Sequence, residues 1–176
     1  MSDARLQPIR MILTDVDGVL TDGRIQLDAN TFAETKSFHV HDAAGIVYWH
    51  RSGGLSGFLS GRSAPVVERR AQELGVIEVH LGFLDKEPIL DRILERHQLK
   101  AEQVAYIGDD LLDLPVLQRV GYSVAPPEAR PDVLSAVDYV TRVGAGFGVM
   151  REVIELVMQA QGTWQRVVDS SGKGKP

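Results

Sequence analysis

The sequence predicts an α/β protein in which a parallel sheet is covered by helices on both faces. Short apolar runs with strand character alternate with stretches of helical periodicity, and this alternation is typical of βαβ units. Three polar residues, Asp15, Ser60 and Asp109, lie at the ends of such runs. Because parallel sheets bind ligands beyond the carboxyl ends of their strands, these residues mark the expected functional edge.

Each element can be placed in chain order. The predicted strands are residues 9–14, 55–60, 76–81, 104–107, 122–125 and 139–141. The predicted helices are residues 64–74, 87–97 and 149–159, where apolar residues recur every three or four positions. Residues 24–40 break the alternation and have Asp28-Ala29-Asn30 in their middle, which predicts a short β-hairpin flap after the first strand.

The length of 176 residues suits one domain with a sizeable core. We expect this domain to cover residues 1–165, with the hairpin as an insert and no separate cap domain. Residues 166–176 end in a segment rich in Ser, Gly and Lys, which predicts a flexible C-terminal tail.

Composition restricts the classes of function. The net charge of -5 argues against nucleic acid as the partner, but a metal ion and local cations still allow an anionic substrate. The absence of cysteine excludes disulfides, thiol catalysis and Cys-based zinc sites. The first residues lack the apolar segment of a secretory signal, and no apolar run is long enough to cross a bilayer. We therefore expect a cytoplasmic protein without a membrane partner.

Two carboxylates, Asp15 and Asp17, follow the first predicted strand and are themselves followed by Gly18. Phosphoryl transfer needs a nucleophile, a metal ion and charge neutralisation. One carboxylate can attack phosphorus and bind Mg²⁺, while the second handles the proton of the leaving group. Gly18 lets the chain turn close to a phosphate. The same residues are typical of an ordinary solvated turn, so this motif alone leaves both interpretations open.

Two later positions favour a phosphate site. Ser60 can donate a hydrogen bond to a phosphate oxygen, although a serine in this position is also a common helix N-cap. Lys86 opens a predicted helix, where a cation is unfavourable against the helix dipole, so its placement indicates a role such as holding a phosphate. The alternative for Lys86 is a surface lysine whose ammonium group reaches solvent.

A cluster of acids, Asp109, Asp110 and Asp113, follows the fourth predicted strand. Carboxylates this close repel one another unless a hard cation is present, and Mg²⁺ prefers oxygen ligands. The cluster therefore indicates a Mg²⁺ site, with Asp110 and Asp113 supporting its ligands from behind. Capping of the following helix is the alternative for these two residues, and we favour it for one of them.

In chain order, the series Asp15-x-Asp17, Ser60, Lys86 and Asp109-x-x-x-Asp113 resembles the four motifs of the haloacid dehalogenase superfamily. The resemblance covers roughly residues 9–160. It implies a Rossmann-like sheet, with Asp15 as the nucleophile and Asp17 as the acid/base. It also implies that Mg²⁺ is bound by Asp15, the Asp17 backbone carbonyl and Asp109, and that Ser60 and Lys86 hold the phosphoryl group.

A closer resemblance, which covers nearly the whole chain, is to the 3-deoxy-D-manno-octulosonate 8-phosphate (KDO 8-phosphate) phosphatases. It rests on the short hairpin and on the runs Asp15-Val-Asp-Gly-Val-Leu-Thr-Asp-Gly23, Ser60-Gly-Arg62, Gly108-Asp-Asp-Leu-Leu-Asp-Leu-Pro-Val116, Ala136-Val-Asp-Tyr-Val-Thr141 and Gln161-Gly-Thr-Trp164. Members of that family are cap-less tetramers in which the hairpins and C-terminal tails of neighbours help to close each site. They release phosphate during synthesis of the KDO sugar of lipopolysaccharide. The resemblance thus implies a homotetrameric, Mg²⁺-dependent phosphatase that acts on an acidic sugar phosphate through an aspartyl-phosphate.

The resemblance also implies a set of substrate-binding residues. Arg62 and Arg70 are candidate cations for the carboxylate or phosphate of the substrate, with a solvated helix face as the alternative. His39 and His41 lie two positions apart, so on a strand they share a face and can contact the sugar. A second metal site at these histidines lacks a third ligand. The complete set is Asp17, Phe38, His39, Val40, His41, Asp42, Arg62, Arg70 and Lys86.

The chain departs from the family pattern near this set. The usual Phe-Asn-x-x-Asp-Gly is here Phe38-His39-Val40-His41-Asp42-Ala43, and Val47 follows Gly45-Ile46 where a basic residue is common. Leu112 stands where the wider superfamily commonly has Asn. Because these departures leave the catalytic set intact, the main alternative is a phosphatase for a related acidic sugar, such as a nine-carbon keto-acid 9-phosphate.

Two alternatives from other classes fit the sequence less well. A phospho-receiver signalling domain carries adjacent acids at its first strand and its phosphorylated Asp on a later one, whereas this chain has Asp15-x-Asp17 and then Ser60. A non-catalytic interaction module has no need of the complete acid set.

Overall fold

A six-stranded parallel sheet forms the centre of the computed structural model, which describes residues 3–171. The strands follow the order β5-β4-β1-β6-β7-β8, and every neighbouring pair is parallel. β1 lies inside the sheet, where Met11 is opposite both Leu55 of β4 and Val104 of β6. The strands are β1 (Met11–Thr14), β4 (Leu55–Ser60), β5 (Glu78–Leu81), β6 (Val104–Ile107), β7 (Tyr122–Ala125) and β8 (Tyr139–Val140).

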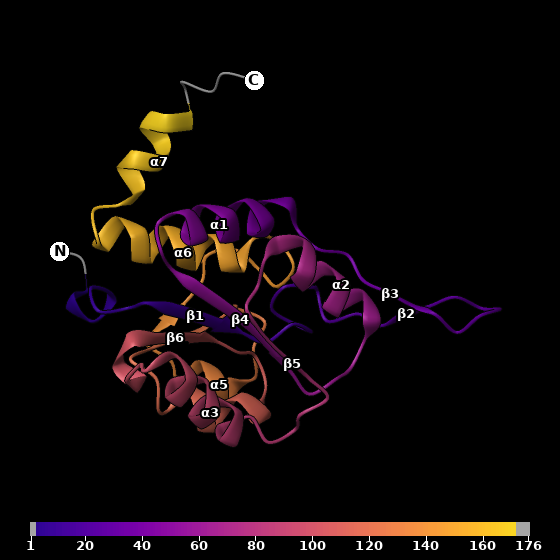
Figure 1. The fold of residues 1–176 in the computed structure, drawn as a ribbon. Coiled ribbons are helices and arrows are strands. Elements are labelled where there is room, and N and C mark those ends of the chain that lie inside the picture. The colour runs from indigo at the N-terminus through magenta and orange to yellow at the C-terminus, as the bar shows by residue number, and fades with distance from the viewer. Residues whose placement is uncertain (1–2, 172–176) are drawn as a thin grey trace.

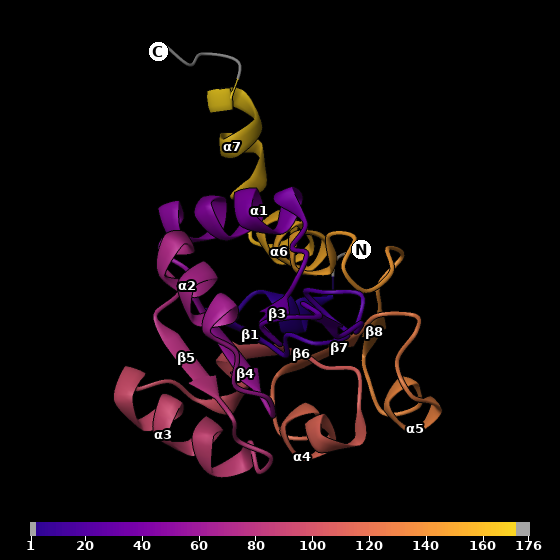
Figure 2. The same cartoon turned by 90° about the vertical axis from the view of Figure 1, so that its right-hand side faces the viewer.

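Helices cover both faces of this sheet (Figure 1; Figure 2). One face packs against α1 (Val40–Arg51), α2 (Pro65–Leu74) and α6 (Val149–Ala160). The other face packs against α3 (Glu87–His97), α4 (Leu114–Leu117) and α5 (Pro131–Leu134). The predicted fold class is therefore confirmed. Short 3₁₀ turns are formed by η1 (Ala4–Leu6), η2 (Ala101–Gln103) and η3 (Leu111–Asp113).

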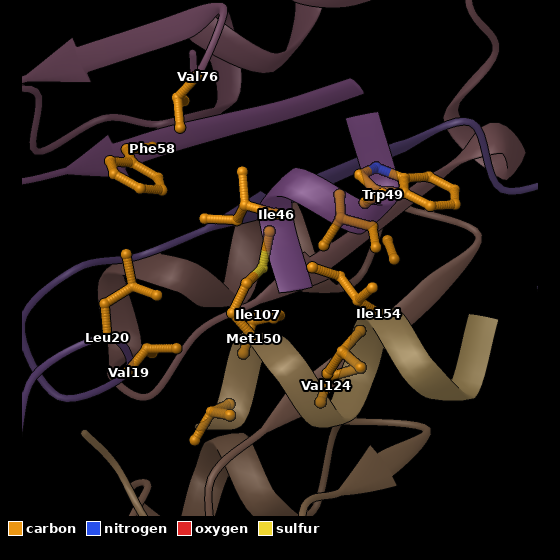
Figure 3. Packing of buried hydrophobic residues seen from close by; sticks show 14 of the residues in the cluster. Val19, Leu20, Ile46, Trp49, Phe58, Val76, Ile107, Val124, Met150 and Ile154 are labelled. Carbon is orange, nitrogen blue, oxygen red and sulfur yellow. The ribbon is translucent and has the colours of Figure 1, made fainter. Parts of the chain in front are cut away.

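The two faces bury separate apolar cores because successive strand residues point to opposite sides. On β1, Ile12 belongs to the core under α1, α2 and α6, whereas Leu13 belongs to the core under α3, α4 and α5. In the first core, Ile46 of α1 lies close to Met150 of α6 (Figure 3), and Trp49 of α1 belongs to the same cluster. Full burial of a side chain of this kind contributes about 1.5–3 kcal/mol. Covered on both sides, β1 is a firm support for the residue that follows it.

A glycine allows α1 and α6 to approach closely. A Cβ at Gly45 would lie 3.0 Å from Arg151 Cδ and 3.2 Å from Arg151 Cα. One turn earlier, the Asp42 carboxylate accepts a hydrogen bond from the Arg151 backbone N–H at 2.8 Å. Asp42 thus caps the beginning of α6 from another helix, and burial raises the pKa of its carboxyl to about 6.

The hairpin is shorter than the predicted insert of residues 24–40. Its strands β2 (Gln26–Leu27) and β3 (Glu34–Thr35) contain two residues each and pair antiparallel. The hairpin projects from the edge of the sheet at which the parallel strands end (Figure 1).

The sequence prediction contains no helix at residues 40–51, where the structure has α1. The helix signal there is weak for two reasons. The N-cap is His39 instead of the usual Ser, Thr, Asp or Asn, and Gly45 in the interior is an unfavourable helix residue.

The C-terminal segment also differs from its prediction. α7 (Trp164–Ser171) projects beyond the end of α6 (Figure 1), so residues 166–171 of the tail predicted to be flexible are helical. The rest of that tail, residues 172–176, lies outside the described residues. Within residues 3–171, no helix combines the length and apolar character needed to cross a membrane.

Candidate active site

Three neighbouring strands, β4, β1 and β6, bring the predicted strand-end residues to one edge. The backbone N–H of Asp15 donates to the Ile107 carbonyl at 2.8 Å, which continues the pairing of β1 with β6. The Asp15 carboxylate accepts from the Val16 backbone N–H at 2.7 Å. Asp15 and Asp109 are close enough, together with Asp113, to present one oxygen each within 4.8 Å of one another.

Gly18 brings the loop after β1 directly onto Asp109. Its φ of 92° lies in the left-handed region, which favours glycine. A Cβ at this position would lie 2.1 Å from Asp109 Oδ2. The loop that carries Asp15 and Asp17 can therefore sit against Asp109 only because residue 18 has no side chain.

Lys86, the N-cap of α3, extends its side chain into the cluster formed by Asp15, Asp109 and Asp113. It is 2% exposed, so the alternative of a surface lysine is wrong. Its Nζ lies 3.2 Å from Asp15 Oδ1 and 2.6 Å from Asp113 Oδ1, and it donates to the Tyr106 hydroxyl at 3.1 Å. Burial alone disfavours the ammonium form, but Asp15 and Asp113 outweigh burial and raise the pKa of Lys86.

Asp113 is a fully buried anchor of this cluster. Its Oδ1 accepts from Lys86 and from the Tyr106 hydroxyl, and its Oδ2 accepts from the backbone N–H groups of Asp109 and Asp110 at 3.0 and 3.2 Å. The two carboxylate oxygens of Asp113 therefore already accept four hydrogen bonds. Asp110 accepts from the Leu111 backbone N–H at 2.8 Å and is the N-cap of η3, so the capping alternative holds for Asp110.

The remaining acids of the cluster have the properties of a cation site. Burial raises the pKa of Asp15 to about 7, and the charge of Asp113 adds to this shift. Burial, followed by the charges of Asp15 and Asp113, raises the pKa of Asp109 to about 8. Asp109 Oδ1 is buried without a hydrogen-bond partner among residues 3–171. A hard divalent cation would favour the ionised carboxylates and supply that missing partner.

Asp17 faces the hairpin instead of the acid cluster. It forms an ion pair with Lys36, whose side chain is 1% exposed, and its Oδ2 lies 3.8 Å from Nε of Arg62. Glu34 of the hairpin contacts the same two cations, at 2.7 Å from Lys36 Nζ and 2.9 Å from Arg62 Nη2. Lys36 and Glu34 are site residues that the sequence analysis did not identify. Their spacing of two in a segment predicted to be extended, which would place both side chains on one face, is the signal that the sequence offers.

Ser60 ends β4 and is 2% exposed. Its Oγ accepts from the Arg62 backbone N–H at 3.1 Å. The N-cap of α2 is Ala64, so the alternative that Ser60 caps this helix is wrong. Its hydroxyl lies at the functional edge and shapes the turn that carries Arg62.

The other predicted substrate-binding residues lie around the start of α1. The Arg70 guanidinium stacks 5.9 Å from the ring centre of Phe38, which itself packs on the core. His39 and His41 are the N-cap and first turn of α1, so the prediction that they share a strand face is wrong, although their ring centres are 4.8 Å apart. Val40 is exposed. Asp42 is buried against α6, where its Oδ1 caps that helix, and its contact with the sugar stays a prediction.

The haloacid dehalogenase-like hydrolases have a family model that matches residues 59–153. The chain belongs to this family. It is 42% identical over 158 residues to the KDO 8-phosphate phosphatase of Haemophilus influenzae, and the match covers 90% of this chain and 87% of that protein. The predicted superfamily and the closer resemblance are thereby confirmed.

Solved structures of this family agree with the fold. A probable YrbI family phosphatase from Pseudomonas syringae pv. phaseolica is 40% identical, with a TM-score of 0.94 over 97% of both chains. The KDO 8-phosphate phosphatase of Moraxella catarrhalis is 33% identical, with a TM-score of 0.92 over 94% of this chain and 95% of that one. The latter structure is a complex with a magnesium ion, a phosphate ion and a KDO molecule.

Proposed function

We propose that the protein is a Mg²⁺-dependent phosphatase that hydrolyses KDO 8-phosphate to KDO and inorganic phosphate. The observation that carries the reaction type is the buried Lys86 ammonium 3.2 Å from Asp15 Oδ1, at an edge that also holds Asp109 and Ser60. The substrate is supported by the 42% identity to a KDO 8-phosphate phosphatase over most of both chains. The product would supply the KDO sugar of lipopolysaccharide.

The reaction proceeds in two steps on Asp15. The Asp15 carboxylate attacks phosphorus, and the bond from phosphorus to the sugar oxygen breaks as Asp17 donates a proton to that oxygen. Asp17 then accepts a proton from the water that attacks the aspartyl-phosphate, which frees Asp15 and inorganic phosphate. Lys86 offsets negative charge in both steps, and Ser60 donates a hydrogen bond to a phosphoryl oxygen.

Mg²⁺ fits the donors of the acid cluster. The proposed ligands are Asp15, Asp109 and the backbone carbonyl of Asp17, and the unpartnered Asp109 Oδ1 supports this choice. When bound, the ion neutralises charge that the phosphate and the carboxylates share. Asp113 supports the site from behind, since it accepts the backbone N–H of Asp109 and holds the Lys86 ammonium.

The sugar would be recognised by residues at the part of the sheet edge that lies next to the hairpin. Arg62, half exposed and next to Asp17, is the cation that we assign to the carboxylate of the substrate. Arg70, on α2 and stacked on Phe38, is a second cation. His39, the N-cap of α1, and His41, in its first turn, are proposed to contact hydroxyl groups of the sugar.

We further infer that the protein assembles as a homotetramer whose neighbouring hairpins cover each site. The hairpin carries apolar side chains that residues 3–171 leave exposed, with Phe32 76% and Leu27 56% exposed. Light scattering after gel filtration should give four times the chain mass of 19.3 kDa. A monomer at working concentration would contradict the tetramer without affecting the chemistry.

A phosphate-release screen over sugar phosphates tests the function. We expect Mg²⁺-dependent release from KDO 8-phosphate, well above release from neutral sugar phosphates and from the nine-carbon keto-acid 9-phosphate. Asp15→Asn should abolish turnover while keeping the wild-type melting temperature, and Asp132→Asn on the exposed surface of α5 is the matched control. A folded Asp15→Asn variant with near wild-type activity would remove Asp15 as the nucleophile. Similar rates on unrelated phosphates would count against KDO 8-phosphate.

A further inference from the structure

Glu34 is a hairpin carboxylate that lies inside the site of its own chain. Its Oε2 is 2.9 Å from Arg62 Nη2, and its Oε1 is 2.7 Å from Lys36 Nζ. The same two cations contact Asp17. Glu34, Asp17, Lys36 and Arg62 therefore form a group of two negative and two positive charges, which we call the flap network.

The flap network has no surplus positive charge for an added anion. The Lys36 side chain is 1% exposed and is enclosed between Asp17 and Glu34. Arg62 is 51% exposed, so it is the cation of this network that a ligand can reach. Lys86 is already shared between Asp15 and Asp113. An acidic sugar phosphate brings a second anionic group, and that group finds Arg62 paired with Glu34.

We propose that Glu34 is a specificity-determining residue that competes with the carboxylate of the substrate for Arg62. This inference rests on the proposed function, because it requires a substrate with a carboxylate as well as a phosphate. A carboxylate matches the planar guanidinium of Arg62 as Glu34 does, and it can replace Glu34 without leaving Arg62 unpaired. A phosphate ester without a second anion leaves the Glu34–Arg62 contact in place.

The competition predicts a selective gain in affinity when the charge of Glu34 is removed. Glu34→Gln keeps the size and polarity of the side chain but leaves Arg62 free for the substrate. Arg62 is half exposed, so the effect has the size of a solvent-screened ion pair. We expect the KM for KDO 8-phosphate to fall about fivefold, and the KM for phenyl phosphate to change less than about twofold.

Two further variants make the test specific. Arg62→Met combined with Glu34→Gln should lose the gain, because the cation that the two carboxylates share is absent. Asp28→Asn removes an equal charge from the hairpin tip, where Asn can still accept the local hydrogen bonds that Asp28 receives from Asn30 and Thr31, and it should leave both KM values unchanged. Melting temperatures of all variants are compared with wild type.

The outcomes separate the inference from the function on which it rests. A KM for KDO 8-phosphate that is unchanged or higher in Glu34→Gln overturns the inference, as does an equal fall for phenyl phosphate. A gain that persists in the double variant also overturns it. A wild-type protein that hydrolyses phenyl phosphate but no acidic sugar phosphate overturns the proposed function and this inference together.

Discussion

Replacement of Lys86 by Met removes a buried charge while preserving much of the side chain's volume. The Lys86 ammonium lies 2.6 Å from Asp113 Oδ1 and 3.2 Å from Asp15 Oδ1 and is 2% exposed. Loss of one partner from a buried ion pair typically costs about 3–5 kcal/mol, since the remaining charge stays buried without compensation. We expect Lys86→Met to lower the free energy of unfolding of the metal-free protein by about this amount.

Mg²⁺ should reduce this loss of stability, because a cation at Asp15 and Asp109 replaces part of the missing positive charge. Activity should not recover to the same degree. Lys86 also stabilises the charge of the transferring phosphoryl group, and loss of one such contact lowers kcat by about 10²–10³-fold.

Urea unfolding in EDTA and in Mg²⁺, together with phosphate release at saturating Mg²⁺, measures both effects. Lys100→Met, at an exposed lysine, is the matched control and should resemble wild type in every measurement. A Lys86→Met variant within about 1 kcal/mol of wild type in EDTA would contradict the assigned burial of the charge. A kcat within roughly tenfold of wild type would contradict its role beside the phosphoryl group.

Three further predictions concern neighbouring residues. Burial raises the pKa of Asp15 to about 7 and of Asp109 to about 8, so the folded chain holds protons there that the unfolded chain releases near pH 4. Without metal, the free energy of unfolding should therefore fall as the pH rises from about 4 to 8, and saturating Mg²⁺ should flatten this dependence in urea titrations. Gly18→Ala places a Cβ 2.1 Å from Asp109 Oδ2, and the Mg²⁺ concentration for half-maximal activity should rise by roughly tenfold or more; an unchanged Mg²⁺ titration contradicts the close contact. Asp42→Ala should lower stability by about 1–2 kcal/mol in urea unfolding while leaving KM unchanged, and a raised KM at normal stability would show that Asp42 acts on the substrate and not on the helix cap.

The sequence predicts strands well where a hydrophobic run covers the same residues that form backbone hydrogen bonds to neighbouring strands. Residues 55–60, 104–107 and 122–125 are strands with the predicted bounds. The first predicted strand begins two residues too early. Ile9 is fully buried like the strand that follows, but its backbone N–H bonds to Leu6 and not to a neighbouring strand. The hydrophobic pattern of the sequence reports which residues are buried, whereas a strand is defined by backbone hydrogen bonds to a neighbouring strand. At the end of a strand a residue such as Ile9 can be buried without being paired.

The positions of Asp15, Ser60 and Asp109 follow from the topology alone, since parallel neighbours end at one edge. The flap network does not follow from it. The spacing of two between Glu34 and Lys36 places both side chains on one face if the chain stays extended after β3, but the angle of the hairpin decides whether this face meets the site or solvent. That angle depends on packing between distant parts of the chain.

The segment after the hairpin shows how a wrongly predicted secondary structure changes the interpretation of function. On a strand, positions 39 and 41 share a face, whereas on a helix they are about 200° apart. The structure places His39 before α1 as its N-cap, where its Nδ1 accepts from the His41 backbone N–H at 3.3 Å. In the helical register, Asp42 turns toward α6, where its Oδ1 accepts from the Arg151 backbone N–H. We therefore expect substrate choice in this chain to depend more on Glu34, which lies 2.9 Å from the proposed carboxylate-binding cation Arg62, than on Asp42.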